Sequence, residues 1–249
     1  MHYGELKTAW NELTAPGAPF EIIRIPVLGQ ELRAYKNAPP TIRHFWLSTA
    51  AYGERTYLVY GDERITYAEA HARVAAIANW ILDAGVKPGD RVAIAMRNYP
   101  EWMLIYWACA CIGVAAVGMN AWWVPEEMAY AFKDSAPKII FCDPERLERI
   151  IERPEIAGDA KVVVTRAKAV PAGMTDYADV LARGGSLPDI TVDPDADACI
   201  FYTSGTTGNP KGAQLTHRGC MSNLMNMMFS GQVQGLATQR ATGVEIGRA

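Results

Sequence analysis

The feature that most constrains the fold is an alternation of short apolar runs with helix-like segments through the middle of the chain. Apolar runs of strand length lie at Arg91–Met96, Lys138–Cys142 and Lys161–Thr165, and helical signals separate each run from the next. Strands that alternate with helices are typical of a parallel, doubly wound sheet with helices on both faces. We therefore expect an α/β protein with a mostly parallel sheet and flanking helices.

The boundaries of several helices are also readable. Thr66 followed by Glu69 is a capping box, and Gly85 is placed to end the helix that starts there. Further helices are expected to begin at Pro125, where two glutamates follow, and at Asp143, which precedes Pro-Glu. The remaining elements expected are strands at Phe20–Leu28, Thr56–Tyr60, Arg64–Thr66 and Val114–Met119, and helices at Trp102–Ile112 and Asp176–Ala182.

A loop rich in glycine and hydroxyl groups follows the last apolar run, Ala198–Tyr202. Glycines allow a backbone to approach a ligand closely, and successive backbone N–H groups in such a turn form an anion site. Hydroxyls add donors and a lysine adds a positive charge, so the loop suits a polyphosphate. Its candidate binding residues are Thr203, Ser204, Gly205, Thr206, Thr207, Gly208 and Lys211.

The spacing of this loop differs from that of a P-loop NTPase. The P-loop places Ser or Thr directly after its Gly-Lys pair and opens into a helix. Here Lys211 follows Pro210 and precedes Gly212, and Lys211–Thr216 has the pattern of a second strand. Thr216 is a good N-cap for a helix that begins near His217. The loop is therefore expected to join strand to strand, and a divergent P-loop NTPase is the less favoured alternative.

The run Tyr202-Thr-Ser-Gly-Thr-Thr-Gly-Asn-Pro-Lys-Gly212, followed by Leu215-Thr-His-Arg218, resembles the phosphate-binding signature of the adenylate-forming (AMP-binding) enzymes. It is most similar to the acyl-CoA synthetase (fatty-acid–CoA ligase) branch. Residues 82–98 and 113–120 also resemble N-terminal stretches of that branch, so the likeness extends over about residues 56–230. The resemblance implies the N-terminal portion of the adenylate-forming fold.

The resemblance also implies an activity. A carboxylic acid and ATP would give an acyl-AMP and pyrophosphate, and coenzyme A would then give a thioester, with Mg²⁺ assisting. Lys211 would be the catalytic residue, and the loop residues named above would hold the phosphates. The partners implied are a small carboxylic acid, ATP and coenzyme A. A phosphate-binding fragment without catalysis remains the alternative from another class.

The resemblance further implies later residues, namely a Glu for Mg²⁺, an Asp for the ribose and a second lysine, for which no matching segment is found. We therefore expect the N-terminal part of a larger enzyme, inactive by itself and self-associating through the surface left uncovered. The expected domains are an N-terminal segment (1–55), an α/β subdomain (56–190) and the start of a second α/β subdomain (191–249). The linker candidate is residues 184–197.

Composition excludes several other classes. A net charge of −3 without a basic stripe argues against nucleic-acid binding. The five cysteines form no C-x-x-C pair, so we expect free thiols, no metal site and a cytoplasmic protein.

The uncharged segment Trp102–Pro125 is long enough to span a membrane, but Gly113 divides it into a helix and a strand. His217 and the Met-rich stretch Met221–Met228 are interpreted as packing residues, and Trp122 and Trp123 as a packed corner.

Overall fold

The computed structural model of the protein describes residues 3–203 and 210–243. The chain divides into two compact units, one formed by Met1–Pro40 with Arg218–Ala249 and the other by Thr41–His217. The domain boundaries expected from the sequence, at residues 55/56 and 190/191, stay a prediction.

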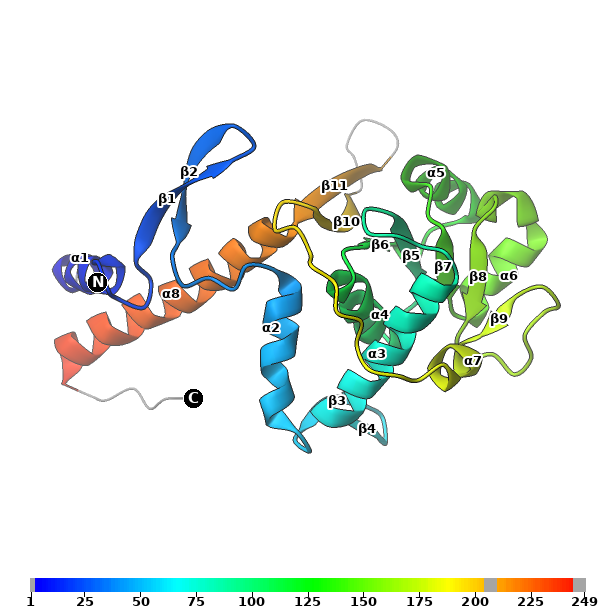
Figure 1. Cartoon of the computed structure of the whole chain (residues 1–249), viewed down its shortest axis with the longest axis horizontal. Coiled ribbons are helices and arrows are strands. Elements are labelled where there is room, and N and C mark those ends of the chain that lie inside the picture. Colours follow the sequence, from blue (N-terminus) through cyan, green and yellow to red (C-terminus); the bar gives the residue numbers. More distant parts are fainter. Residues whose placement is uncertain (1–2, 204–209, 244–249) are drawn as a thin grey trace. The chain divides into compact units, whose positions relative to one another are not determined.

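The larger unit is built on a seven-stranded sheet with the order β11-β10-β6-β5-β7-β8-β9 (Figure 1). Every neighbouring pair in it is parallel except β10 with β11. The predicted α/β fold with a mostly parallel sheet is confirmed. The strands are β5 (Arg91–Ala95), β6 (Ala115–Gly118), β7 (Ile139–Cys142), β8 (Lys161–Val164), β9 (Thr175–Asp176), β10 (Asp197–Thr203) and β11 (Lys211–Thr216).

Helices and a separate hairpin complete this unit. The hairpin pairs β3 (Thr56–Tyr60) with β4 (Glu63–Thr66). The helices are α2 (Ile42–Ser48), α3 (Tyr67–Asp83), α4 (Pro100–Cys111), α5 (Pro125–Ser135), α6 (Pro144–Glu152) and α7 (Tyr177–Ala182), with short 3₁₀ turns η1 (Thr49–Tyr52) and η2 (Pro154–Ala157).

Central strand β7 shows why helices cover both faces of the sheet. All four of its side chains are buried, and successive side chains point to opposite faces. On one face Phe141 packs edge-on against Trp80 of α3 and Tyr177 of α7. On the other face Ile140 belongs to a core that includes Phe132 of α5. The sheet is therefore doubly wound, as the alternation in the sequence predicts.

The helix boundaries follow the capping signals in the sequence. Thr66 Oγ1 accepts from the Glu69 amide at 3.2 Å, and the Glu69 carboxylate accepts from the Thr66 amide at 2.8 Å. Gly85 follows α3 with a φ of +92°, a conformation that glycine adopts without strain. Asp143 caps α6 by accepting from the Arg146 amide at 3.1 Å. These local signals fix where the helices begin and end.

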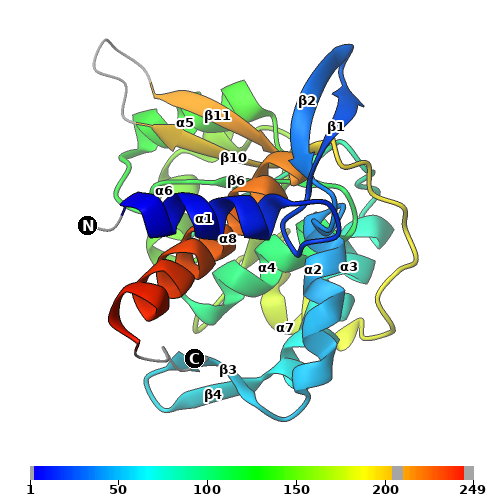
Figure 2. The ribbon, with the colours of Figure 1, turned by 90° about the vertical axis from the view of Figure 1, so that its left-hand side faces the viewer.

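Strands β11, β10 and β6 lie side by side (Figure 2), so β10 and β11 extend the sheet that β5–β8 form. The sequence suggested that they start a second subdomain. The first half of β10 is buried and apolar, and it pairs in parallel with β6, which would otherwise be an exposed edge. Its pairing places Thr203, the last residue of β10, at the edge of the sheet where the parallel strands end.

The smaller unit contains α1 (Tyr3–Thr14), a hairpin of β1 (Ile22–Val27) with β2 (Gln30–Tyr35), and α8 (His217–Thr242) from Arg218 onward. Its core joins Phe20 and Leu13 to Phe229 and Val233 of α8. This packing explains why α8 continues through the polar stretch after Gly231, which the sequence did not identify as helical. Of the methionines in Met221–Met228, Met221 and Met225 are buried and Met227 and Met228 are exposed.

In the described ranges, no helix combines the length and apolar content needed to cross a bilayer. The uncharged segment Trp102–Pro125 divides as predicted, into α4 and β6, with Gly113 at a φ of +68° between them.

Candidate functional site

The two described ends of the predicted phosphate loop are Thr203 and Lys211. Thr203 is the last residue of β10, Lys211 is the first residue of β11, and the two are register partners in the antiparallel ladder. Both are exposed, and the Thr203 hydroxyl donates to the Lys211 carbonyl at 3.4 Å. Within the described part of the chain, no acidic side chain pairs with the Lys211 ammonium. The five other predicted binding residues, Ser204, Gly205, Thr206, Thr207 and Gly208, lie outside the described residues.

This pair offers the donor set expected at an anion site. A hydroxyl and an ammonium stand side by side at the carboxyl edge of a parallel sheet, where ligands of doubly wound folds bind. Both groups can donate to phosphate oxygens, and the Lys211 ammonium cannot ligate a metal ion. We assign no described residue to Mg²⁺. Among the described residues, no cluster of three or more His, Cys, Asp or Glu side chains could hold a metal.

His217, the first residue of α8, is fully buried at 0% exposure. Its backbone amide donates to the Ala196 carbonyl at 3.1 Å, but neither ring nitrogen has a partner among the described residues. Burial lowers the pKa of His217 to about 4, although Asp193 acts in the opposite direction. The imidazole is therefore neutral at pH 7, as expected of a packing residue.

We expect the stability of the larger unit to fall as the pH drops below 6.5, because of His217. Its folded pKa of about 4 lies below the ordinary 6.5, so the unfolded chain binds the proton more readily. The stabilisation is complete above pH 6.5 and decreases toward pH 4, by about 1 kcal/mol between pH 6.5 and 5.5. Urea unfolding at a series of pH values measures it. His217→Leu should flatten the curve over this interval, and an equal slope in the variant would contradict the assignment.

A buried ionic network lies beside the carboxyl ends of β5 and β7. The Arg146 guanidinium donates to both Asp143 oxygens at 2.9 Å, to Glu145 at 2.8 Å and to the Ala121 carbonyl at 2.6 Å. The Arg97 amide donates to Asp143 at 2.9 Å. Arg146 and Asp143 are each 1% exposed. The network ties together the segments that follow β5, β6 and β7, so it shapes this edge of the sheet.

The neighbouring tryptophans behave differently from each other. Trp123 is 6% exposed and packs in the core, which agrees with the expected corner. The expectation of a packed corner is wrong for Trp122, which is 71% exposed and has the Arg97 guanidinium 3.9 Å from the centre of its ring. This cation–π contact holds an aromatic face at the surface.

Four of the five cysteines, Cys109, Cys111, Cys142 and Cys199, are buried. Burial raises the pKa of Cys111 and of Cys142 to about 12. A thiol with so high a pKa is protonated at neutral pH and is a poor nucleophile.

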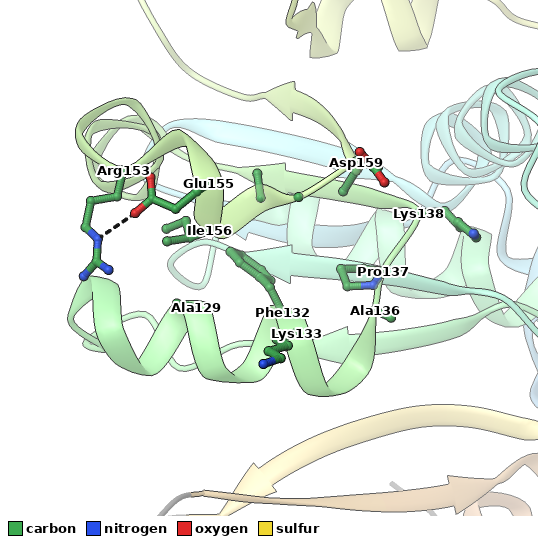
Figure 3. A pocket seen from close by; sticks show the side chains of 13 residues that line it. Ala129, Phe132, Lys133, Ala136, Pro137, Lys138, Arg153, Glu155, Ile156 and Asp159 are labelled. Carbon is green, nitrogen blue, oxygen red and sulfur yellow. Dashed lines mark hydrogen bonds and ion pairs between the residues drawn. The ribbon is translucent and has the colours of Figure 1, made fainter.

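A separate pocket, with a volume of about 500 Å³, lies between α5 and η2 (Figure 3). Figure 3 shows Phe132 and Ile156 lining its floor, and the Arg153–Glu155 ion pair at one end. Its rim includes Lys138, directly before β7, so the pocket lies at the amino ends of the strands. Thr203 and Lys211 lie at the carboxyl edge, so the pocket is distinct from the candidate site.

The fold defines a doubly wound α/β protein, and Thr203 and Lys211 lie at the carboxyl edge, where proteins of this class bind their ligands. Comparison with known sequences is more specific, because the AMP-binding enzyme family matches residues 45–242. The chain belongs to this family.

Several curated relatives of the chain are coenzyme A ligases or synthases, and one is a nonribosomal peptide synthetase. The chain is 36% identical over 173 residues to a feruloyl-CoA synthase of Amycolatopsis sp, covering 70% of this chain and 32% of that protein. It is 32% identical over 176 residues to a 3-hydroxybenzoate/4-hydroxybenzoate–CoA ligase of Thauera aromatica, covering 68% and 33%. The chain thus spans about a third of the length of these relatives.

Solved structures agree in fold. An anthranilate CoA ligase in complex with anthranoyl-AMP superposes with a TM-score of 0.68 at 20% identity, covering 72% of this chain and 35% of that one. ATP-bound MatB from Rhodopseudomonas palustris gives 0.55 at 32% identity, covering 67% and 32%. The adenylate-forming N-terminal fold that the resemblance implied is confirmed.

Sequence reasoning missed the contacts that hold this edge of the sheet. It identified Asp143 only as a helix cap and did not consider Arg146 as its partner. It placed Gly118 within an expected strand, Val114–Met119, without assigning it a role. A glycine inside a strand pattern is a recognised sign of a close approach, and here the Phe201 ring lies against Gly118.

Proposed function

We propose that the protein is an ATP-dependent carboxylate-activating ligase that forms an acyl-AMP and then a thioester of coenzyme A. The observation that carries the proposal is the pair of Thr203 and Lys211 at the carboxyl edge of the sheet. Membership of the AMP-binding enzyme family and the coenzyme A ligases among the relatives support it. A divergent P-loop NTPase is not favoured, because the loop joins two antiparallel strands.

In the first step a carboxylate oxygen attacks the α-phosphorus of ATP, and the bond to pyrophosphate breaks. The carboxylate is already ionised at pH 7, so the step needs no general base. We therefore do not assign that role to His217, which is buried. Negative charge grows on the leaving pyrophosphate. The Lys211 ammonium would balance that charge, and Thr203 would help to orient the phosphates. Mg²⁺ bound with the triphosphate would neutralise part of the same charge.

We further propose that these 249 residues alone bind ATP weakly and do not complete the reaction. The resemblance implies ribose and Mg²⁺ contacts for which the chain offers no matching residues. Most of the expected pocket for the acid would also come from residues outside this sequence.

The deciding experiment measures pyrophosphate release with ATP and a panel of acids, including ferulate, 4-hydroxybenzoate and a long-chain fatty acid. It is run on this chain and on the complete ligase. Release that depends on the acid, followed by loss of free coenzyme A thiol, supports the proposal. ATP hydrolysis without any acid would favour an NTPase. If the complete ligase showed neither activity, the proposed reaction would be overturned, and a phosphate-binding protein without catalysis would remain.

A further inference from the structure

The two residues before Thr203 are each fixed to a different face of the sheet. Phe201 is the register partner of Gly118 on β6, and Tyr202 is the register partner of Gly212 on β11. Because neighbouring side chains of a strand point to opposite faces, these two rings lie on opposite sides of β10.

On one face the Phe201 ring occupies space that only a glycine leaves free. A Cβ built on Gly118 would lie 2.8 Å from the ring, closer than real Cβ atoms approach. Beyond it, Trp102 of α4 stacks with Phe201 at an interplanar angle of 10° and a centroid distance of 6.4 Å. Phe201 is therefore seated between β6 and α4.

On the other face Tyr202 is tied to α5. Its hydroxyl donates to the Asp134 carboxylate at 2.6 Å, and Trp123 meets its ring edge-on at 5.6 Å. Burial, and next the hydrogen bond to Asp134, raise the pKa of Tyr202, so the hydroxyl stays protonated and keeps donating. Across the ladder, a Cβ on Gly212 would lie 3.3 Å from the ring, so glycine again permits the contact.

We infer that Tyr202 is a positioning residue for Lys211. Its hydrogen bond to Asp134 anchors the end of β10 to helix α5. Because β11 is hydrogen-bonded to β10, with Lys211 opposite Thr203, fixing the end of β10 also fixes the backbone of Lys211. The inference rests on the proposed function for the role of Lys211, but the anchoring itself is a property of the strands. In this role Tyr202 does not touch the substrate and acts only through Lys211.

Hydrogen exchange of the backbone amides in β10 and β11 tests the anchoring in the chain as it exists. Tyr202→Phe removes the hydroxyl and keeps the ring, so we expect exchange in β11 to rise about tenfold, as for loss of one hydrogen bond to a charged acceptor. Asp134→Ala should have the same effect. The double variant should add nothing further, because both changes remove one contact. Asp134→Asn retains an acceptor and should keep most of the protection.

Tyr177→Phe is the matched control. The Tyr177 hydroxyl is buried and has no partner among the described residues, so its removal should leave exchange in β11 unchanged. In the complete ligase, Tyr202→Phe should lower kcat for adenylation severalfold when Lys211 is present and have no further effect in the Lys211→Ala variant, because Tyr202 acts only through Lys211. A merely structural loss would lower the active fraction, and with it kcat, equally in both backgrounds.

The outcomes separate the two proposals. Unchanged exchange in Tyr202→Phe, or an equal rise in Tyr177→Phe, would overturn the anchoring. Increased exchange with an equal fall in kcat with and without Lys211 would overturn the role in placing Lys211. If the complete ligase released no pyrophosphate with any acid, the proposed function would fail, and the exchange data would still decide whether Tyr202 anchors the strand.

Discussion

Replacing Lys211 by alanine is expected to lower kcat for adenylation in the complete ligase by about 100-fold, roughly 3 kcal/mol of transition-state stabilisation. The reason is that its ammonium balances charge which grows on pyrophosphate only as the bond breaks. Lys211→Arg should recover part of the rate, because the charge remains but the planar guanidinium is larger than a point ammonium. The rate of acid-dependent pyrophosphate release is measured for the unmodified ligase and for both variants.

Lys138→Ala is the matched control for this prediction. Lys138 is an exposed lysine at the amino end of β7, at the opposite edge of the sheet from Lys211. Its loss should change kcat by less than twofold, about the scatter expected for a remote surface substitution. Thermal melting confirms that each variant is folded. A folded Lys211→Ala ligase with near-normal adenylation would show that the lysine is structural, and the assignment of the site would fail.

Arg146→Ala is expected to destabilise the larger unit by about 3–5 kcal/mol, because it leaves the buried Asp143 carboxylate without its cation. Both side chains are 1% exposed, so water cannot replace the lost contacts. The Ala121 carbonyl would also lose its donor. Urea unfolding of the variant, compared with the unmodified chain at pH 7, measures the loss.

Arg153→Ala provides the comparison. Arg153 also pairs with acidic residues, Glu126 and Glu155, but those carboxylates are 70% and 66% exposed. Exposed ion pairs contribute little to stability, so we expect the free energy of unfolding of Arg153→Ala to change by less than about 0.5 kcal/mol. Similar losses in the two variants would mean that burial does not govern the strength of the Arg146 network.

The central elements of the fold are predictable because their signals are local. The strands β5, β7 and β8 are continuous apolar runs, and the capping box at Thr66 lies within four residues. The start of α8 at His217 is likewise marked by the preceding Thr216. Each of these patterns specifies its own structure before any tertiary contact forms.

The N-terminal elements α1, β2 and α2 were not predicted. Helix α1 has only 12 residues, and isolated helices of that length are marginal without tertiary packing. It is held in its unit by contacts such as the edge-on packing of Trp10 against Phe229, which is far away in the sequence. Local patterns cannot report such contacts.

The chemical groups of the candidate site are predictable from the sequence, but the tertiary contacts that hold them in place are not. The hydroxyls, glycines and lysine of residues 203–212 are visible in the sequence, and the strands on either side follow from their apolar and β-type residues. The bond between Tyr202 and Asp134 joins residues 68 positions apart. Nothing in either local sequence indicates the other, so only the folded chain reveals that anchor.

The antiparallel pairing of β10 with β11 separates two properties of the predicted phosphate loop, its length and the distance between its two ends. Paired strands fix the separation of Thr203 and Lys211, and the residues between them do not set it. Insertions or deletions in that connection would therefore alter its reach while leaving the lysine in register with the threonine. The placement of the lysine thus depends on the pairing of β10 with β11 and not on the length of the connection between them.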